Sequence, residues 1–200
     1  MSSAYCFLSA VPMRSTPSDR AEMVNQLLKG DTFVILEQQE KWSRIRCDYD
    51  GYEGWIDNKQ WKPCPAPPTA PQPLHSSPAE VALSQYMDAP YLWGGRTIMG
   101  IDCSGLTQVC FKACGIKLLR DASQQATQGT EVRSLDEARR DDLCFFANPE
   151  GRIIHVGIYL GQGRIVHASG QVRNDLLTPQ GIYNEERGCY THTLACIRRI

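Results

Sequence analysis

Cys103 lies between an aspartate and a serine, where an amphipathic helix is predicted to begin. The apolar residues after it recur at helical spacing, and Gly115 marks the predicted end of the helix. Backbone N–H groups at a helix start lack partners within the helix and carry partial positive charge, which favours a thiolate and can hold an oxyanion. A buried structural thiol or a metal ligand would fit the position too. Cys103 is therefore a candidate nucleophile.

A candidate base comes from two histidines, His155 and His167, on two predicted strands joined by the turn 161–163. If the turn has three residues, His167 lies opposite Gly157, and His155 lies one diagonal step away on the same sheet face. A two-residue turn would place the two rings on opposite faces. If both rings lie on the same face, one ring could accept the thiol proton while the other fixes its tautomer. The alternative is two histidines that are hydrogen-bonded separately within a sheet.

Two further residues close to the cysteine could take part in the chemistry. Tyr91 lies in a loop shortly before Cys103, where its phenol could donate to a developing oxyanion, although a core tyrosine fits equally well. An ionised Asp102 would raise the pKa of the cysteine and is a poor candidate base. We expect Asp102 to pair with a cation, such as an amine of a substrate.

A proline-rich stretch, residues 63–73, divides the 200-residue chain. We therefore predict an N-terminal domain over 1–62, a linker over 63–76 and a larger domain over 77–200. The net charge of −1 gives no reason to expect nucleic acid or an acidic membrane as a partner. Nine cysteines without a CxxC spacing predict neither a disulfide framework nor a zinc site, and no cofactor is expected.

The N-terminal domain has the pattern of a small all-β barrel or sandwich. Residues 31–38 and 42–49 are predicted strands, and Asp50-Gly51 predicts a tight turn before a further strand. Residues 20–28 are expected to form a helical turn or a long loop.

The C-terminal domain combines helices with a later set of strands. Ser77 and the proline after it predict a helix start over 77–88. Strands are predicted over 142–147, 154–161 and 164–169. Helices followed by antiparallel strands predict an α+β domain.

The motifs "YLWGG", "GIDCSGLTQVCF", "HVGIYLG" and "VHASG" together resemble those of the NlpC-type, papain-like cysteine peptidases, over about residues 80–200. Residues 1–62 resemble a bacterial SH3-type domain. The resemblance implies a papain-like catalytic domain, with an antiparallel sheet and packed helices, after a small SH3-like barrel. It also implies that Cys103 is the nucleophile, His155 the base and His167 its orienting partner. Tyr91 and the backbone N–H of Cys103 would be the oxyanion donors.

The resemblance also implies a substrate pocket, with residues from both domains. The implied pocket residues are Asp102, Ser104, Arg120, Asp121, Ser123, Glu22 and Tyr52. Ala122 stands where the family often has a serine, so one pocket hydrogen bond is in doubt.

The function implied is hydrolysis of the γ-D-glutamyl–diamino acid bond in murein peptides that carry a free N-terminal L-alanine. We expect neither metal nor cofactor, and neither a nucleic acid nor a membrane partner. Because no export signal is visible, we expect a cytoplasmic place in wall-peptide recycling, and if the protein is exported by another route it would act as a wall hydrolase. The alternatives are a non-catalytic wall-peptide binding protein and an acyltransferase of related fold.

Overall fold

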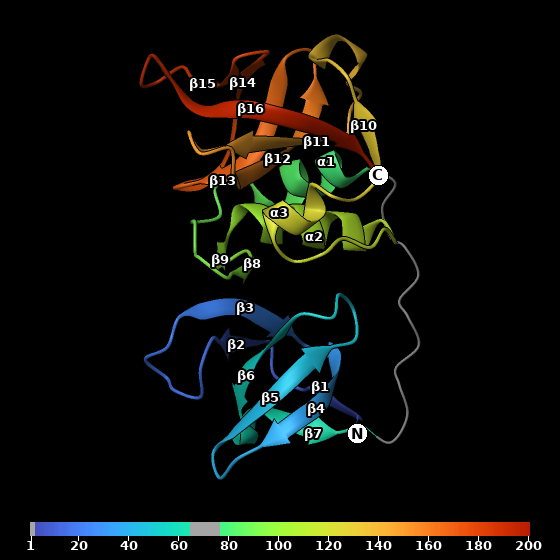
Figure 1. Cartoon of the computed structure of the whole chain (residues 1–200), viewed down its shortest axis with the longest axis vertical. Helices are drawn as coiled ribbons and strands as arrows, with labels where there is room; N and C mark the ends of the chain where they lie inside the picture. The colour runs from blue at the N-terminus through green and yellow to red at the C-terminus, as the bar shows by residue number, and fades with distance from the viewer. Residues whose placement is uncertain (1–2, 65–76) are drawn as a thin grey trace. The chain divides into compact units, whose positions relative to one another are not determined.

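A computed structural model describes residues 3–64 and 77–200 of the chain (Figure 1). The described residues form two compact units, of which one combines residues 3–64 with Leu92–Thr97 and the other combines 77–91 with Ile98–Ile200. The predicted linker falls almost entirely on residues 65–76, outside the described residues. The boundaries at residues 62 and 77 remain predictions.

The N-terminal unit is an antiparallel sheet in the order β3-β2-β6-β5-β4-β1-β7, wrapped around one apolar core. Its strands are β1 (Ser3–Cys6), β2 (Ala10–Arg14), β3 (Met23–Leu28), β4 (Thr32–Gln38), β5 (Trp42–Cys47), β6 (Glu53–Asp57) and β7 (Trp61–Pro63), with a 3₁₀ turn at Asn58–Gln60. The buried core residues are Ala4, Cys6, Val11, Met13, Leu27, Phe33, Ile45, Cys47 and Ile56.

Strands β4 and β5 confirm the prediction for this unit, but the expectation of a helical turn or loop over residues 20–28 was wrong. Most of that segment is β3, which pairs antiparallel with β2. The buried positions in β3 alternate, Asn25 and Leu27 both being fully buried. Because one of the two buried side chains is polar, the segment lacked the apolar alternation that indicates a strand.

The C-terminal unit has an antiparallel sheet in the order β10-β16-β11-β12-β13-β14-β15, in which β15 also pairs with β16. The strands of this sheet are β10 (Thr130–Val132), β11 (Leu143–Ala147), β12 (Ile153–Gly161), β13 (Arg164–Ser169), β14 (Gln171–Thr178), β15 (Gly181–Asn184) and β16 (Cys189–Arg199). The unit also contains the short strand β9 (Gly100–Ile101), outside this sheet. The short strand β8 (Arg96–Thr97) belongs to the segment grouped with the first unit.

Three helices cover one face of this sheet, as Figure 1 shows. They are α1 (Pro78–Val81), α2 (Cys103–Ala113) and α3 (Ala122–Gln125), with a π-helical turn at Ala82–Tyr86 and a 3₁₀ turn at Leu135–Glu137. Ser77 caps α1 by accepting from the N–H of Glu80, as predicted. The unit therefore has the predicted α+β architecture.

Helix α2 begins at the predicted residue and lies on β12 and β13. The carboxylate of Asp102 caps the helix by accepting from the N–H of Gly105 at 2.6 Å. The helix ends at Ala113, and Gly115 follows in the left-handed conformation with φ of 77°. The apolar stripe of α2 thus fixes the head of the helix against the strand that carries His155.

The hairpin of β12 and β13 has the predicted three-residue register, in which Gly157 pairs with His167. Gln162 at its tip adopts a positive φ of 53° between two glycines that do the same. A Cβ added to Gly157 would lie 2.9 Å from the Cβ of His167, so glycine gives the histidine the space that it occupies. The register brings His155 and His167 to one face of the sheet, as predicted.

Candidate active site

The thiol of Cys103 is enclosed at the head of α2, where the residue is 6% exposed. It makes hydrogen bonds with the backbones of Ser104 and Val156. Because Val156 directly follows His155 on β12, the second contact places the sulfur beside the strand of the candidate base. The structure therefore brings the predicted nucleophile to the sheet that carries the histidines.

The two predicted histidines form a directly bonded pair. Nε2 of His155 lies 2.9 Å from Nδ1 of His167, and both side chains are buried. On its far side, Nε2 of His167 lies 3.1 Å from a carboxylate oxygen of Asp175. Arg173 holds the same carboxylate through Nε at 2.7 Å and Nη2 at 3.0 Å. A continuous chain of contacts thus runs from His155 to a buried carboxylate–guanidinium pair.

Sequence reasoning missed Asp175 and Arg173, because β14 was not among the predicted strands. In the structure β14 pairs with β13, with Arg173 opposite His167 and Asp175 opposite Ile165. The segment 171–178 carries little sequence signal of a strand, because its three apolar residues do not alternate regularly with polar ones. A third strand next to the hairpin would have placed both residues on the histidine face.

A further histidine, also without a predicted role, stacks on the candidate base. The ring of His192, on β16, lies 4.2 Å from the ring of His155 between centroids, with 23° between the planes. Phe146 on β11 contacts both rings at centroid distances of 5.8 and 5.9 Å. The plane of His155 is therefore held by packing on one face as well as by its bond to His167.

The pKa values in the site do not follow the expectation of a thiolate favoured by its helix position. Burial, reinforced by the charge of Asp102, raises the pKa of the Cys103 thiol to about 12, although its backbone hydrogen bonds and Arg120 act in the opposite direction. Burial, together with the charges of His167 and His192, holds the pKa of His155 well below its usual value. Neither group gains charge alone in this enclosed site, so proton transfer from sulfur to imidazole must create both charges together, each stabilising the other.

Asp102, expected to pair with a cation, does so inside the chain. Arg120 binds its carboxylate through both nitrogens of the guanidinium fork, at 3.0 and 2.6 Å, and both side chains are almost fully buried. Arg120 also donates to the hydroxyl of Ser104 at 2.9 Å. The three predicted pocket residues Asp102, Ser104 and Arg120 thus form one network beside the thiol. The negative charge next to the sulfur is balanced by an arginine.

Tyr91 is held close to the thiol by backbone contacts. It forms a parallel bridge with Ile101, two residues before Cys103, and its N–H donates to the carbonyl of Gly170 at 2.9 Å. Burial, together with the charges of Cys103 and Asp102, raises the pKa of the Tyr91 phenol to about 12. The phenol keeps its proton and is available as a donor near the sulfur.

Two predicted pocket residues, Asp121 and Ser123, are associated with the short helix α3. Asp121 caps that helix in a capping box, with its N–H donating to Gln124 at 3.1 Å. Ser123 is exposed on the helix surface. Ser104 and Arg120 thus lie in the network beside the thiol, whereas Asp121 and Ser123 belong to the start of α3, and the pocket roles of all four remain predictions.

The two candidates in the N-terminal unit have partners within that unit. The carboxylate of Glu22 accepts from the indole N–H of Trp93 at 2.7 Å, in the segment grouped with this unit. Tyr52 packs against the core of the barrel, and its N–H donates to Asp50 at 3.0 Å. Their roles in substrate binding remain predictions.

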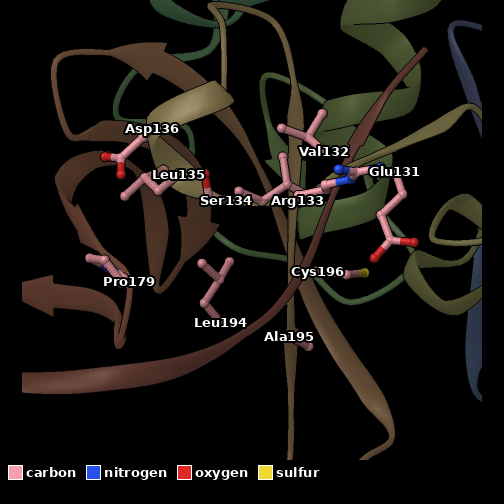
Figure 2. Close-up of a pocket in the computed structure, with 11 residues that line it drawn as sticks. Glu131, Val132, Arg133, Ser134, Leu135, Asp136, Pro179, Leu194, Ala195 and Cys196 are labelled. Carbon is pink, nitrogen blue, oxygen red and sulfur yellow. The ribbon is translucent and has the colours of Figure 1, made fainter.

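A pocket of about 330 Å³ opens elsewhere in the C-terminal unit, between β10, β16, the 3₁₀ turn at Leu135–Glu137 and the turn at Pro179 (Figure 2). Its lining residues are Glu131, Val132, Arg133, Ser134, Leu135, Asp136, Pro179, Leu194, Ala195, Cys196 and Ile197. The lining includes none of the thiol–histidine site.

In the described parts of the chain, no cluster of three or more His, Cys, Asp and Glu side chains could hold a metal ion. Within residues 3–64 and 77–200, no helix is long and apolar enough to span a bilayer.

A buried thiol at a helix start, placed against an antiparallel sheet with a bonded histidine pair, defines the papain-like class. The comparisons agree with this class. The chain belongs to the NlpC/P60 family, whose model matches residues 88–192. Residues 13–60 match the bacterial dipeptidyl-peptidase SH3 domain. Both resemblances inferred from the motifs are confirmed.

Curated relatives match about half of the chain. A γ-D-glutamyl-L-lysine dipeptidyl-peptidase of Bacillus subtilis is 40% identical over 114 residues, which cover 53% of this chain and 38% of the relative. A protein of the same name from Bacillus cereus is 33% identical over 96 residues, covering 47% of this chain and 28% of that protein. The matched region thus spans less than two fifths of the length of these relatives.

Solved structures support the fold over nearly the whole chain. An NlpC/P60 family protein from Bacillus cereus has a TM-score of 0.54 at 23% identity, covering 99% of this chain and 63% of that one. NlpC2 from Trichomonas vaginalis has a TM-score of 0.53 at 21% identity, covering 98% and 71%. At such identities, the likeness concerns the fold.

Proposed function

We propose that this chain is a cysteine peptidase that hydrolyses the amide between γ-D-glutamate and a diamino acid in murein peptides with a free N-terminal L-alanine. The observation that carries the proposal is the enclosed thiol of Cys103 at the head of α2, beside the strand of the bonded His155–His167 pair. The names of the two Bacillus relatives support the substrate class, and point to lysine as the diamino acid.

The chemistry divides hydrolysis into two acyl transfers. The sulfur of Cys103 attacks the γ-carbonyl carbon while its proton moves to His155, so that the two opposite charges form together. The tetrahedral oxyanion accepts hydrogen bonds from the phenol of Tyr91 and from the backbone N–H at the start of α2. Collapse breaks the C–N bond, and His155 gives its proton to the leaving amine. Water, deprotonated by His155, then hydrolyses the thioester and releases L-alanyl-γ-D-glutamate.

Recognition of the free amine requires an acidic partner, and Asp102 is our candidate. Its carboxylate oxygens already accept from Arg120 and Gly105, so the ammonium group would share an occupied carboxylate. The hydroxyl of Ser104 donates to the same carboxylate at 3.4 Å. We place the activity in the cytoplasmic turnover of released wall peptides, a proposal that follows from the preference for a free amine.

The proposal is tested by incubating L-Ala-γ-D-Glu-L-Lys, and in parallel the diaminopimelate peptide, with the protein and with Cys103→Ala. Mass spectrometry of the released L-Ala-γ-D-Glu measures turnover. Cys189→Ala is the matched control, because it removes an exposed thiol that lies outside the site. We expect the control to keep the activity of the wild type and Cys103→Ala to lose it. Equal turnover by Cys103→Ala and the wild type would refute the nucleophile assignment.

The amine preference has its own test. N-acetylation of the alanine removes the positive charge and should reduce kcat/KM strongly while leaving the scissile bond unchanged. Unchanged cleavage of the acetylated peptide would show that Asp102 does not bind the amine. A wall-peptide binding protein would bind both peptides without releasing products, and an acyltransferase would give a transfer product instead of the free dipeptide.

A further inference from the structure

The histidine pair is part of a longer chain of contacts that ends in a charged pair. Asp175 is 3% exposed, and its carboxylate contacts His167 on one side and Arg173 on the other. The guanidinium of Arg173 is one-fifth exposed and also binds the exposed carboxylate of Glu186, at 3.1 Å. Neither the motif pattern nor the family resemblance assigned a role to Asp175 or Arg173.

The direction of each hydrogen bond in this chain follows from which atoms can donate. Burial opposes ionisation of Asp175, but hydrogen bonds from His167 and Arg173 outweigh it and lower the carboxyl pKa to about 2. An ionised carboxylate only accepts, so Nε2 of His167 must carry the proton between them. A neutral imidazole has a single N–H, which makes Nδ1 of His167 an acceptor. Its partner at 2.9 Å, Nε2 of His155, must then be the donor.

We propose that Asp175, held by Arg173, is a positioning residue that fixes the tautomers of both histidines, so that Nδ1 of His155 is the unprotonated nitrogen that receives the proton of Cys103. Arg173 has two functions in this arrangement. Its bidentate bond orients the carboxylate, and its hydrogen bonds help to lower the pKa of the Asp175 carboxyl, so that the group stays an ionised acceptor. The consequence for turnover rests on the proposed function, whereas the proton positions do not.

The arrangement explains why two histidines serve better than one. If His167 carried its proton on Nδ1, it would donate to Nε2 of His155 and force the proton of His155 onto Nδ1, the position that the thiol needs vacant. The stack of His192 on His155 holds the ring plane but does not select a tautomer. Selection therefore depends on Asp175, whose carboxylate lies 3.1 Å from Nε2 of His167.

The proton positions can be observed in the resting protein by nitrogen-15 NMR of histidine-labelled samples at neutral pH. The chain has four histidines, and His155→Gln and His167→Gln assign the signals of the pair. We expect one proton bonded to Nε2 of His155, with a coupling across the hydrogen bond to Nδ1 of His167. A proton bonded to Nδ1 of His167 would overturn the proposal. This measurement needs no substrate, so it stands even if the proposed peptide is not cleaved.

Two substitutions of Asp175 separate positioning from folding. Asp175→Asn keeps an acceptor for His167, whereas Asp175→Leu has similar bulk and no acceptor. We expect Asp175→Leu to lower kcat by about 100-fold and Asp175→Asn by less than about 10-fold, with little change in KM because the side chain touches no substrate. The coupled proton should persist in Asp175→Asn and be lost in Asp175→Leu.

The outcome that contradicts positioning is an unchanged proton signal and an unchanged kcat per folded molecule in Asp175→Leu. If Asp175→Leu does not fold, Asp175→Asn decides together with the wild type. Loss of the coupled proton in Asp175→Asn with full kcat would refute the link between tautomer and turnover. Retention of both supports it.

Discussion

Two aspartate–arginine pairs in the C-terminal unit have nearly the same chemistry and different uses. In each pair the guanidinium binds the carboxylate through two nitrogens. Asp102 and Arg120 are both almost fully buried next to the thiol, whereas Asp175 is buried behind the histidines and Arg173 is one-fifth exposed. The two pairs differ in the second contact of the carboxylate. Asp102 accepts from the backbone N–H of Gly105 at the start of α2, whereas Asp175 contacts the imidazole of His167.

The comparison shows how one kind of pair can shape a site in two ways. Next to the sulfur, a carboxylate charge opposes thiolate formation, so Arg120 is needed to balance it while Asp102 caps α2. Behind the histidines, the carboxylate of Asp175 contacts His167 and acts through the direction of that hydrogen bond. The first pair should therefore matter most for folding and for the thiol, and the second for the state of the imidazoles.

The largest expected effect is on stability, from Arg120→Met. This change leaves the carboxylate of Asp102 buried without its cation, which costs about 3–5 kcal/mol in the free energy of unfolding. Arg44→Met is the matched control, because it removes an ion pair with Glu53 whose two side chains are well exposed, worth less than about 1 kcal/mol. Urea unfolding of both variants measures the difference. Similar losses in the two variants would contradict the structural role of the first pair.

Arg173→Met should have a smaller effect, expressed in the pH dependence of activity. Without Arg173, the carboxyl of Asp175 loses a hydrogen-bond donor that lowers its pKa, so it becomes protonated at a higher pH and no longer acts only as an acceptor for His167. We expect kcat to fall about 10-fold and the acid limb of kcat/KM to move to higher pH. His167 and Glu186 contact this pair, and the charge of Asp175 also acts on His192. A wild-type profile in Arg173→Met would break the comparison.

Glu186→Gln is the control for that profile. It neutralises the exposed carboxylate that Arg173 also binds, and leaves the bonds to Asp175 in place. The acid limb should stay where it is in the wild type. A shift as large as that in Arg173→Met would show that net charge near the site, and not the hydrogen bonds from Arg173 to Asp175, controls the pH dependence of activity.

The smallest expected effect is a loss of stability in mild acid. Burial lowers the pKa of His192 from 6.5 to about 4, and burial also holds the pKa of His155 well below its usual value. The unfolded chain therefore binds more protons than the folded protein below about pH 6.5, and stability falls as the pH falls. For the partly exposed His192 we expect about 1 kcal/mol between pH 7 and pH 5. His192→Phe keeps a stacked ring without a titrating group and should remove the loss of stability that comes from His192. Urea unfolding at both pH values measures the difference.

The sequence predicted the parts of the site that depend on local patterns. The start of α2 at Cys103 follows from a capping aspartate and an apolar stripe, and the facing of His155 and His167 follows from a short turn. Asp175 was not found, because its role depends on a neighbouring strand whose pairing is a tertiary property. The direction of the thiol pKa was also missed, because enclosure of the sulfur between α2 and β12 outweighs the helix position. Residues 20–28 were misassigned since a buried polar residue hid the alternation of β3.

The central claim is that the enclosed thiol of Cys103, and not an accessible one, is the reactive sulfur. A chloromethyl ketone built on L-Ala-γ-D-Glu, with the reactive carbon at the scissile position, tests it directly by alkylating the attacking group. Peptide mapping by mass spectrometry then locates the label among the nine cysteines. We expect labelling of Cys103, which is 6% exposed, well before the exposed Cys189, and much slower labelling of Cys103 in His155→Ala. Labelling of Cys189 first, or the same rate for Cys103 without its histidine, would contradict the account.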